Sequence, residues 1–142
     1  MTDAPRTSTA SSVMAVAASG LRAQQSRMRV IAENIANADS TAATPGGDPY
    51  RRRAPIFEPT RMPDGATGVA MTRVQEEDSA FRTEYAPTNP AANAKGYVKL
   101  PNVDPLIEAL DMREAQRAYE ANLNVIEAAR SMQTRTLDLI KR

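Results

Sequence analysis

The amino-acid sequence contains no cysteine, no histidine and no tryptophan. Without cysteine the chain can form no disulfide bond and offers no thiolate. Without histidine it lacks the usual general base and the commonest metal ligand at neutral pH. A Ser–His–Asp triad, a Cys–His pair and a zinc site with nitrogen or sulfur ligands are therefore impossible within this chain. These absences predict that the protein is not an enzyme and has no catalytic, cofactor-binding or metal-binding residues.

Large apolar residues are scarce as well. Leu, Ile, Val and Phe together supply 23 of the 142 residues, whereas alanine alone supplies 25. That share lies below the roughly 20% at which disorder becomes a real alternative, but the net charge of +1 is too small for a strongly self-repelling chain. An alanine-rich chain of this kind favours helices that cannot bury themselves alone, so we expect partner subunits to complete them.

Long hydrophobic runs and a strong charge of one sign are also missing. No run of about 18 apolar residues occurs, which predicts that no segment inserts directly into a membrane. Residues 1–12 are polar, include Asp3 and lack the apolar core of a secretory signal peptide, so no cleaved signal is expected. The balanced charge argues against a nucleic-acid partner.

The N-terminal part of the chain predicts a tail followed by a long helix. Residues 1–11 hold one proline and five Ser or Thr residues and are predicted to be a disordered tail. A core helix is predicted over 12–38, because side chains of a coiled-coil seam recur every seven residues with a companion row three residues later. The first row is Met14, Leu21, Met28 and Ile35, and the second is Ala17, Gln24, Ile31 and Ala38.

The middle of the chain, residues 39–103, is predicted to be a loop and a small β-rich or extended module. Prolines and glycines at 45–49 break any regular element there. Short strand-like runs occur at Arg51–Phe57, Val69–Gln75 and Tyr97–Leu100. The module is too poor in apolar residues to be stable without docking elsewhere.

The C-terminal part, residues 104–142, predicts a second core helix. Asp104 is a good N-cap residue, Pro105 suits the first helical position, and no Gly or Pro follows. A helix of roughly 37 residues would be about 55 Å long, more than the rest of this chain can cover. We therefore expect a mainly α fold, in which the two terminal helices pair as an antiparallel coiled-coil-like core around a small middle segment.

Asparagines stand out in both predicted helices. Asn34 and Asn37 lie one turn apart on the same face, where they either cap the helix end or hydrogen-bond to a neighbouring helix or loop. Asn122 is a weak helix former in the middle of the second helix, close to Tyr119. It is either exposed to solvent or part of a buried polar pair with the N-terminal helix.

Two further charged runs invite a functional interpretation. Residues Arg51–Arg53 could contact phosphates, but pairing with acidic groups of an adjacent subunit is the better hypothesis, and Glu76–Asp78 is the obvious candidate. The same acidic residues could bind a metal only with difficulty, because consecutive side chains of an extended segment point to opposite sides.

Several segments resemble the axial proteins of the bacterial flagellum, which build its rod and hook. The segment NIANADS begins at Asn34, and AQRAYEANLNVIEAARSMQTRTLDLIKR ends the chain. TPGGDPYRRR at 44–53 and GYVKLPNVDPLIEALDMREAQRAYEAN at 96–122 are similar to the proximal rod members of that family. The resemblance covers about 13–55 and 80–142. The chain departs from the family pattern in an inserted Asp48 and in Asn89, where a histidine is common, so the geometry of the loop at 46–49 stays open.

The resemblance implies a structural subunit that is exported unfolded by the flagellar type III system and polymerises into a hollow shaft in the periplasm. It implies that the N- and C-terminal helices form the inner layer of the rod. The implied partners are copies of the same chain, other rod proteins and the small adaptor that joins the rod to the MS ring. The alternative from a different class is a soluble coiled-coil adaptor that does not polymerise. The residues expected at the assembly interface are Leu21, Met28, Ile31, Asn34, Ile35, Asn37, Tyr119, Asn122, Leu123, Ile126 and Leu137.

Overall fold

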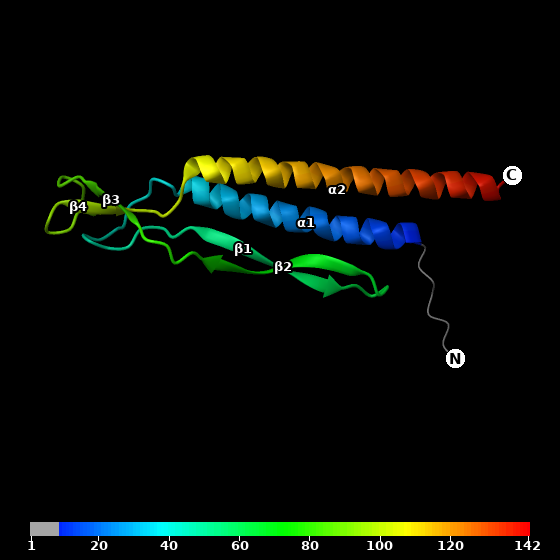
Figure 1. The fold of residues 1–142 in the computed structure, drawn as a ribbon, viewed down its shortest axis with the longest axis horizontal. Coiled ribbons are helices and arrows are strands. Elements are labelled where there is room, and N and C mark those ends of the chain that lie inside the picture. Colours follow the sequence, from blue (N-terminus) through cyan, green and yellow to red (C-terminus); the bar gives the residue numbers. More distant parts are fainter. Residues whose placement is uncertain (1–8) are drawn as a thin grey trace.

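The computed structural model describes residues 9–142, and it is elongated (Figure 1). Helix α1 spans Thr9–Ala36 and helix α2 spans Pro105–Ile140. The two helices run side by side in opposite directions, so that the start of α1 lies near the end of α2 (Figure 1). The tail expected over 1–11 falls mostly outside the described residues, and Thr9–Ser11 already belong to α1.

Four strands connect the helices. Strand β1 (Arg53–Arg61) pairs antiparallel with β2 (Thr67–Glu76), and β3 (Arg82–Tyr85) pairs antiparallel with β4 (Tyr97–Leu100). The β1–β2 hairpin lies along α1 on the side away from α2, while β3–β4 caps the end where α2 begins (Figure 1). The molecule is thus a three-layer rod of helix, helix and hairpin, extended at one end by a second small sheet.

The expectation of a mainly α fold with a small middle segment is wrong. Strands of nine, ten, four and four residues make up about a fifth of the chain, and the β1–β2 hairpin follows much of α1. The run expected at Arg51–Phe57 ends before Pro59, whereas β1 continues through Pro59 to Arg61. In a two-stranded sheet both strands are edges, and an edge strand tolerates proline because one row of its N–H groups needs no partner. A shift of register between Ile56 and Phe57 further adapts β1 to its partner.

The interior is built mainly from alanine. Side chains this small let neighbouring backbones approach closely, but each removes little apolar surface from water. Among residues 9–142, six of the ten buried apolar residues are alanines. The buried apolar residues are Ala17, Ala23, Val30, Ile31, Ala38, Ala91, Val98, Val103, Ala115 and Ala129.

Local sequence signals fix the beginning of α2. The Asp104 side chain accepts hydrogen bonds from the backbone N–H groups of Leu106 and Ile107, at 3.0 and 3.5 Å, and Pro105 occupies the first turn. An N-cap acceptor satisfies amides that have no partner inside the helix. No helix among the described residues is both apolar and long enough to span a lipid bilayer.

The loop that carries Asp48 is anchored on the β3–β4 end. Gly46 has a φ of 70°, and its N–H donates to the Ala91 carbonyl at 3.0 Å. Lys99 Nζ on β4 donates to Asp48 Oδ1 at 2.9 Å, and this ion pair lowers the pKa of Asp48. The loop at 46–49 is therefore held by contacts of Gly46 and Asp48 to the β3–β4 end.

Candidate assembly interface

The seam between α1 and α2 is lined by small residues rather than by the largest apolar ones. Ala115 is fully buried, and a Cβ placed on Gly20 of α1 would lie 2.8 Å from Nδ2 of Asn122 on α2. A side chain at position 20 would therefore require the Asn122 side chain to move. Asn122 is half-buried beside Gly20, between the two alternatives that the sequence left open.

A buried polar cluster joins the end of α1 to the start of α2. Asn34 is fully buried, and its Nδ2 donates to Glu108 Oε2 at 3.2 Å and to the Arg53 carbonyl at 2.8 Å. Its Oδ1 accepts from the Tyr50 hydroxyl at 2.7 Å and from the Arg53 N–H at 3.0 Å. Asn34 thus contacts the neighbouring helix and the loop, whereas Asn37 caps its own helix by donating to the Glu33 carbonyl at 2.8 Å.

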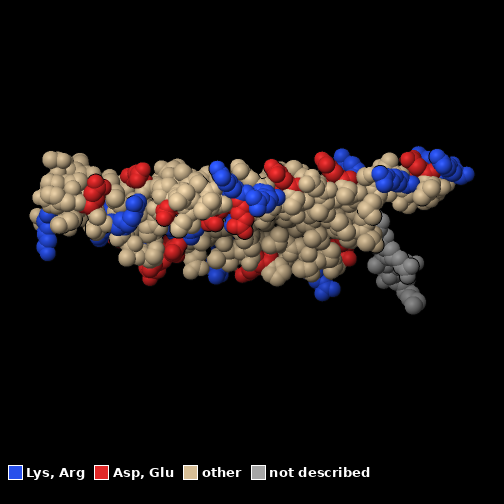
Figure 2. Space-filling view, turned by 45° about the horizontal axis from the view of Figure 1, so that its top comes forward, with Lys and Arg blue, Asp and Glu red and all other residues tan. Residues whose placement is uncertain are grey.

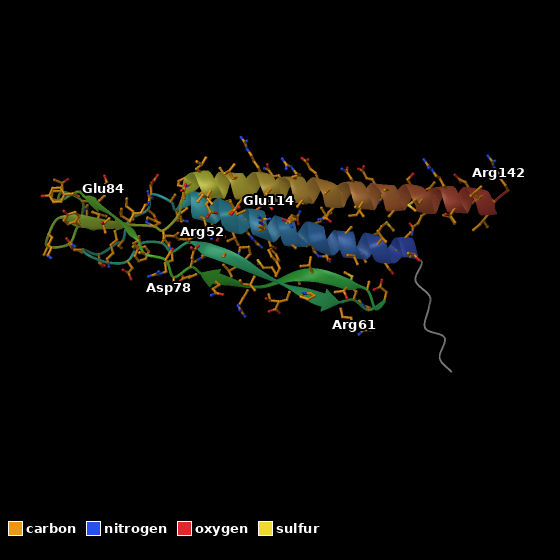
Figure 3. All side chains as sticks on the ribbon, viewed as in Figure 1. Arg52, Arg61, Asp78, Glu84, Glu114 and Arg142 are labelled. Carbon is orange, nitrogen blue, oxygen red and sulfur yellow. The ribbon has the colours of Figure 1, made fainter. Side chains whose placement is uncertain are left out.

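Arg52 provides the counter-charge for Glu108, which is also fully buried. Arg52 Nε donates to Glu108 Oε1, and the same guanidinium donates to Glu77 at 2.8 Å and lies 3.6 Å from Asp111. Burial alone would lower the pKa of Arg52, but its hydrogen bonds to Glu108 and Glu77 outweigh this effect and raise the pKa. Figure 3 places Arg52 at the junction where the two helices, the connecting loop and the hairpin meet. Since a buried carboxylate without a partner is costly, Arg52 stabilises Glu108 in its buried position.

The arginine run finds its acidic partners within the same chain. Arg51 lies 3.4 Å from Asp78, and Arg52 pairs with Glu77. Arg53 instead lies 3.9 Å from Glu33 on α1. The hypothesis that these arginines pair with an adjacent subunit is therefore corrected, because the hairpin brings the acidic residues back beside them.

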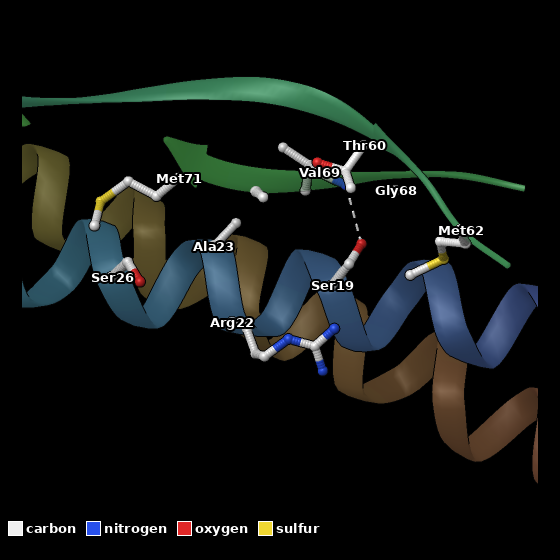
Figure 4. Close-up of a pocket in the computed structure, with 10 residues that line it drawn as sticks. Ser19, Arg22, Ala23, Ser26, Thr60, Met62, Gly68, Val69 and Met71 are labelled. Carbon is white, nitrogen blue, oxygen red and sulfur yellow. Dashed lines mark hydrogen bonds between the residues drawn. The ribbon is translucent and has the colours of Figure 1, made fainter. Parts of the chain in front are cut away.

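The hairpin is fastened to α1 at another close approach. Ser19 Oγ donates to the Val16 carbonyl at 2.6 Å and accepts from the Val69 N–H at 3.1 Å (Figure 4). A Cβ on Gly68 would lie 2.7 Å from Ser19 Oγ, so only glycine permits this contact. The shallow groove beside it, about 210 Å³, is lined by Met62 and Met71 among others and brings no acid–base pair together. No group of three potential metal-ligating side chains occurs in residues 9–142.

The large apolar residues of α2 lie mostly on its surface. The side of α2 that meets α1 is occupied by residues such as Glu108, Ala115 and Ala129, so the long side chains point elsewhere. Contiguous exposed apolar surface is typical of a site that another protein covers. Figure 2 shows charged groups of both signs scattered along the molecule, with wide uncharged areas between them. The exposed large apolar residues of α2 are Leu106, Ile107, Leu110, Leu123, Val125, Met132, Leu137, Leu139 and Ile140.

The expected interface residues fall into three groups in this single chain. Burial within the chain means that a side chain already stabilises the subunit, whereas exposure leaves it free to contact a neighbour. Ile31 and Asn34 are buried, Leu21, Met28, Asn37, Tyr119, Asn122 and Ile126 are half-buried, and Ile35, Leu123 and Leu137 are exposed.

Sequence reasoning missed the residues that hold the layers together. Glu108 is buried although its apolar sequence neighbours Leu106, Ile107 and Leu110 are exposed, so nothing in the local sequence signalled its burial. Its partner Arg52 is 56 residues away in the sequence, and no periodicity connects the two. The role of Ser19 in fastening the hairpin had no sequence signal either.

Comparison with known proteins places these features in a family. The model for the C-terminal part of flagellar basal body rod FlgEFG proteins matches residues 94–139, and that for flagella basal body rod proteins matches residues 14–43. The flagellar basal-body rod protein FlgC of Agrobacterium fabrum is 48% identical over 129 residues, which cover 89% of this chain and 91% of the relative. The chain belongs to the FlgC family of flagellar basal-body rod proteins.

More distant FlgC proteins support the same assignment. The protein of Escherichia coli O6:H1 is 43% identical over 87% of this chain and 92% of its own length, and that of Bacillus subtilis is 39% identical over 89% and 95%. The chain is accordingly a structural subunit of the flagellar basal-body rod, and not an enzyme. As a FlgC-family rod component it assembles with other rod proteins, which favours this reading over the non-polymerising adaptor.

Proposed function

We propose that this FlgC-family subunit builds the proximal part of the rod, as a section of a hollow shaft that crosses the periplasm and transmits motor torque. In this proposal the chain leaves the cell through the flagellar type III export system without a cleaved signal peptide. It then polymerises with copies of itself and with other rod proteins, and at the base of the rod it meets the adaptor that joins the rod to the MS ring.

The observation that carries the proposal is the uncovered apolar surface of α2. Leu123 is 38% exposed and Leu137 is 58% exposed, so the described chain leaves a large part of both residues uncovered. Covering one Leu, Ile or Met side chain contributes about 1.5–3 kcal/mol, so several such contacts per subunit supply a strong driving force for assembly. A helix pair that is incomplete alone is suited to a tube in which neighbours complete it.

The expected interface residues then have two roles. Ile31 and Asn34 shape the subunit, because its own chain already covers them. Ile35, Leu123 and Leu137 are available to neighbours. The half-buried residues, among them Tyr119 and Ile126, lie between these groups, and we propose that neighbouring subunits finish covering them.

The rigid junction suits a part that carries torque. Asn34, Arg52 and Glu108 connect α1, the loop and α2 through hydrogen bonds with fixed directions. Hydrogen-bonded ionic groups in a buried site resist rearrangement, since moving any one of them leaves another without a partner. We propose that this keeps the angle between the helix pair and the β module constant under load.

Substitution at one exposed position tests the proposal. Leu123→Asp should abolish motility and remove the chain from purified basal bodies without reducing its synthesis, because a carboxylate cannot be buried against an apolar neighbour. Asn124→Asp is the matched control, since it adds the same charge at the next, also exposed, position of α2. Normal motility of the Leu123→Asp strain would contradict the proposed interface.

A further inference from the structure

The two ends of α2 both expose apolar side chains that nothing in the described chain covers. At its beginning, Leu106, Ile107 and Leu110 form a surface that we call the start patch, with 53–70% of each residue exposed. At its end, Met132, Leu137, Leu139 and Ile140 form the end patch, with exposures of 58–76%. Single exposed apolar residues are ordinary, but groups of neighbouring ones mark a contact surface.

The start patch is a continuous surface on one side of α2. Leu106 and Leu110 are four residues apart and Ile107 and Leu110 three apart, so these side chains are neighbours on α2. The start patch lies off the side that meets α1, because Glu108, which accepts from Asn34 of α1, marks that side. The start patch is therefore accessible along the outside of the helix pair.

The end patch continues an apolar groove between the helices. This groove of about 620 Å³ is lined by Val13 of α1 and by Val125, Met132 and Leu137 of α2, among other residues. Helix α2 has eight residues more than α1, which adds about 12 Å of length. A neighbouring helix can thus lie against both the groove and the last turns of α2.

The charges around the two patches differ in sign. Residues 127–142 contain four basic and two acidic residues, none of which forms an ion pair within the described chain. Basic groups gather at that end in Figure 2. Residues 104–114 contain four acidic residues and one arginine, and Arg27 and Arg52 from other elements offset part of this acidity. Two acidic residues beside the start patch still face solvent. Asp104 is exposed at the start of the helix, and the Glu114 side chain is 70% exposed although it lies 3.6 Å from Arg27.

We propose that the end patch of one subunit packs against the start patch of a second copy of this chain. The inference rests on the proposed function and names the surfaces through which copies meet. Complementary charge favours this occupant, and the first eight residues of the chain are a poor alternative because Met1 is their only large apolar residue. When the end patch of one subunit contacts the start patch of another, one start patch and one end patch of the pair remain free. Further subunits can therefore add in the same direction.

Engineered disulfides test this contact directly, because the chain has no cysteine of its own. One variant carries Ile107→Cys and the other Leu139→Cys, and both are produced together with the unchanged chain so that rods still assemble. After mild oxidation of purified basal bodies, the mixture should give a disulfide-linked dimer of this chain at about tenfold the yield of either variant alone, since assembly raises the effective concentration of the two thiols. Glu120→Cys with Arg130→Cys, both exposed on α2 outside the patches, is the control pair and should not exceed its single variants.

The results of this experiment distinguish a failure of the proposed contact from a failure of the proposed function. The contact is overturned if the variants are present in basal bodies but give no more dimer than the control pair, and if the pair Leu110→Cys with Ile140→Cys gives the same result. The proposed rod function would then remain intact. A cross-link from Cys at position 139 to a different rod protein would overturn the choice of a second copy. Absence of the unchanged chain from the proximal rod would instead contradict the proposed function.

Discussion

Asn34 and Glu108 are 74 residues apart in the sequence, yet Asn34 Nδ2 donates to Glu108 Oε2 at 3.2 Å and neither side chain is exposed. This contact joins the end of the first helix to the beginning of the second. Arg52 completes it from the loop between them by donating to Glu108. The residues that define the shape of the subunit are thus polar, whereas many of its large apolar residues face outward.

The buried pair of Arg52 and Glu108 predicts a large coupling energy. Arg52→Met should destabilise the subunit by about 3–5 kcal/mol, because it leaves the Glu108 carboxylate buried without its counter-charge. Adding Glu108→Met should restore most of that loss, since an apolar pair of similar volume can replace a buried ion pair. Urea unfolding of the single and double variants measures the coupling, and strictly additive effects would show that the pair does not interact.

The contact between Gly20 and Asn122 predicts that the effect of Gly20→Ala on stability changes sign when the Asn122 side chain is removed. Gly20→Ala alone should destabilise by about 1–3 kcal/mol, since the new Cβ meets the Asn122 side chain at 2.8 Å. In an Asn122→Ala background the same substitution should stabilise by about 0.5–1 kcal/mol, because alanine is the better helix former. Thermal unfolding of the four proteins compares these effects. A stabilising Gly20→Ala in the presence of Asn122 would show that the helices do not touch there.

The raised pKa of Tyr50 predicts how the stability of the subunit changes at alkaline pH. Burial raises the pKa of its phenol, as do Glu33, Glu108 and Glu76, while Arg53 opposes them. Because the folded pKa lies above the unfolded value of about 10, the contribution of Tyr50 is complete below pH 10 and is lost as pH rises through the folded pKa. Unfolding measured from pH 9 to 11.5 should show a fall in stability above pH 10 that is smaller in Tyr50→Phe. An equal fall in both proteins would contradict this assignment.

The alanine-rich core predicts a weakly cooperative isolated subunit. Only four of its ten buried apolar residues are valine or isoleucine, and a long helix depends on packing more than on its own propensity. Circular dichroism of the dilute chain should therefore show a broad thermal transition, with the end of α2 frayed. A sharp, concentration-independent transition of a fully helical monomer would argue that neighbours are not needed.

The sequence predicted local features well where a short segment determines them. Asp104 followed by Pro105 marks the start of α2, and the structure shows the expected N-cap hydrogen bonds. These features depend on a few consecutive residues and on rules that hold in most proteins.

Features that depend on distant segments could not be predicted in the same way. The burial of Glu108 requires Arg52, and the long hairpin requires that α1 offer Ser19 to Val69 and room for Gly68. The helix pair also departs from the rule that large apolar residues lie inside. Gly20 and Ala115 bring the backbones together, so the larger side chains of α2 are directed to the surface, where a single chain gives no partner to predict.

The most direct measurement is a density map of the intact basal body in which this chain is traced. We expect α1 and α2 to remain paired through Asn34 and Glu108, and neighbouring rod subunits to cover Leu123 and Leu137. A map in which the two helices lie apart, or in which these leucines face open solvent in the assembled rod, would contradict this expectation.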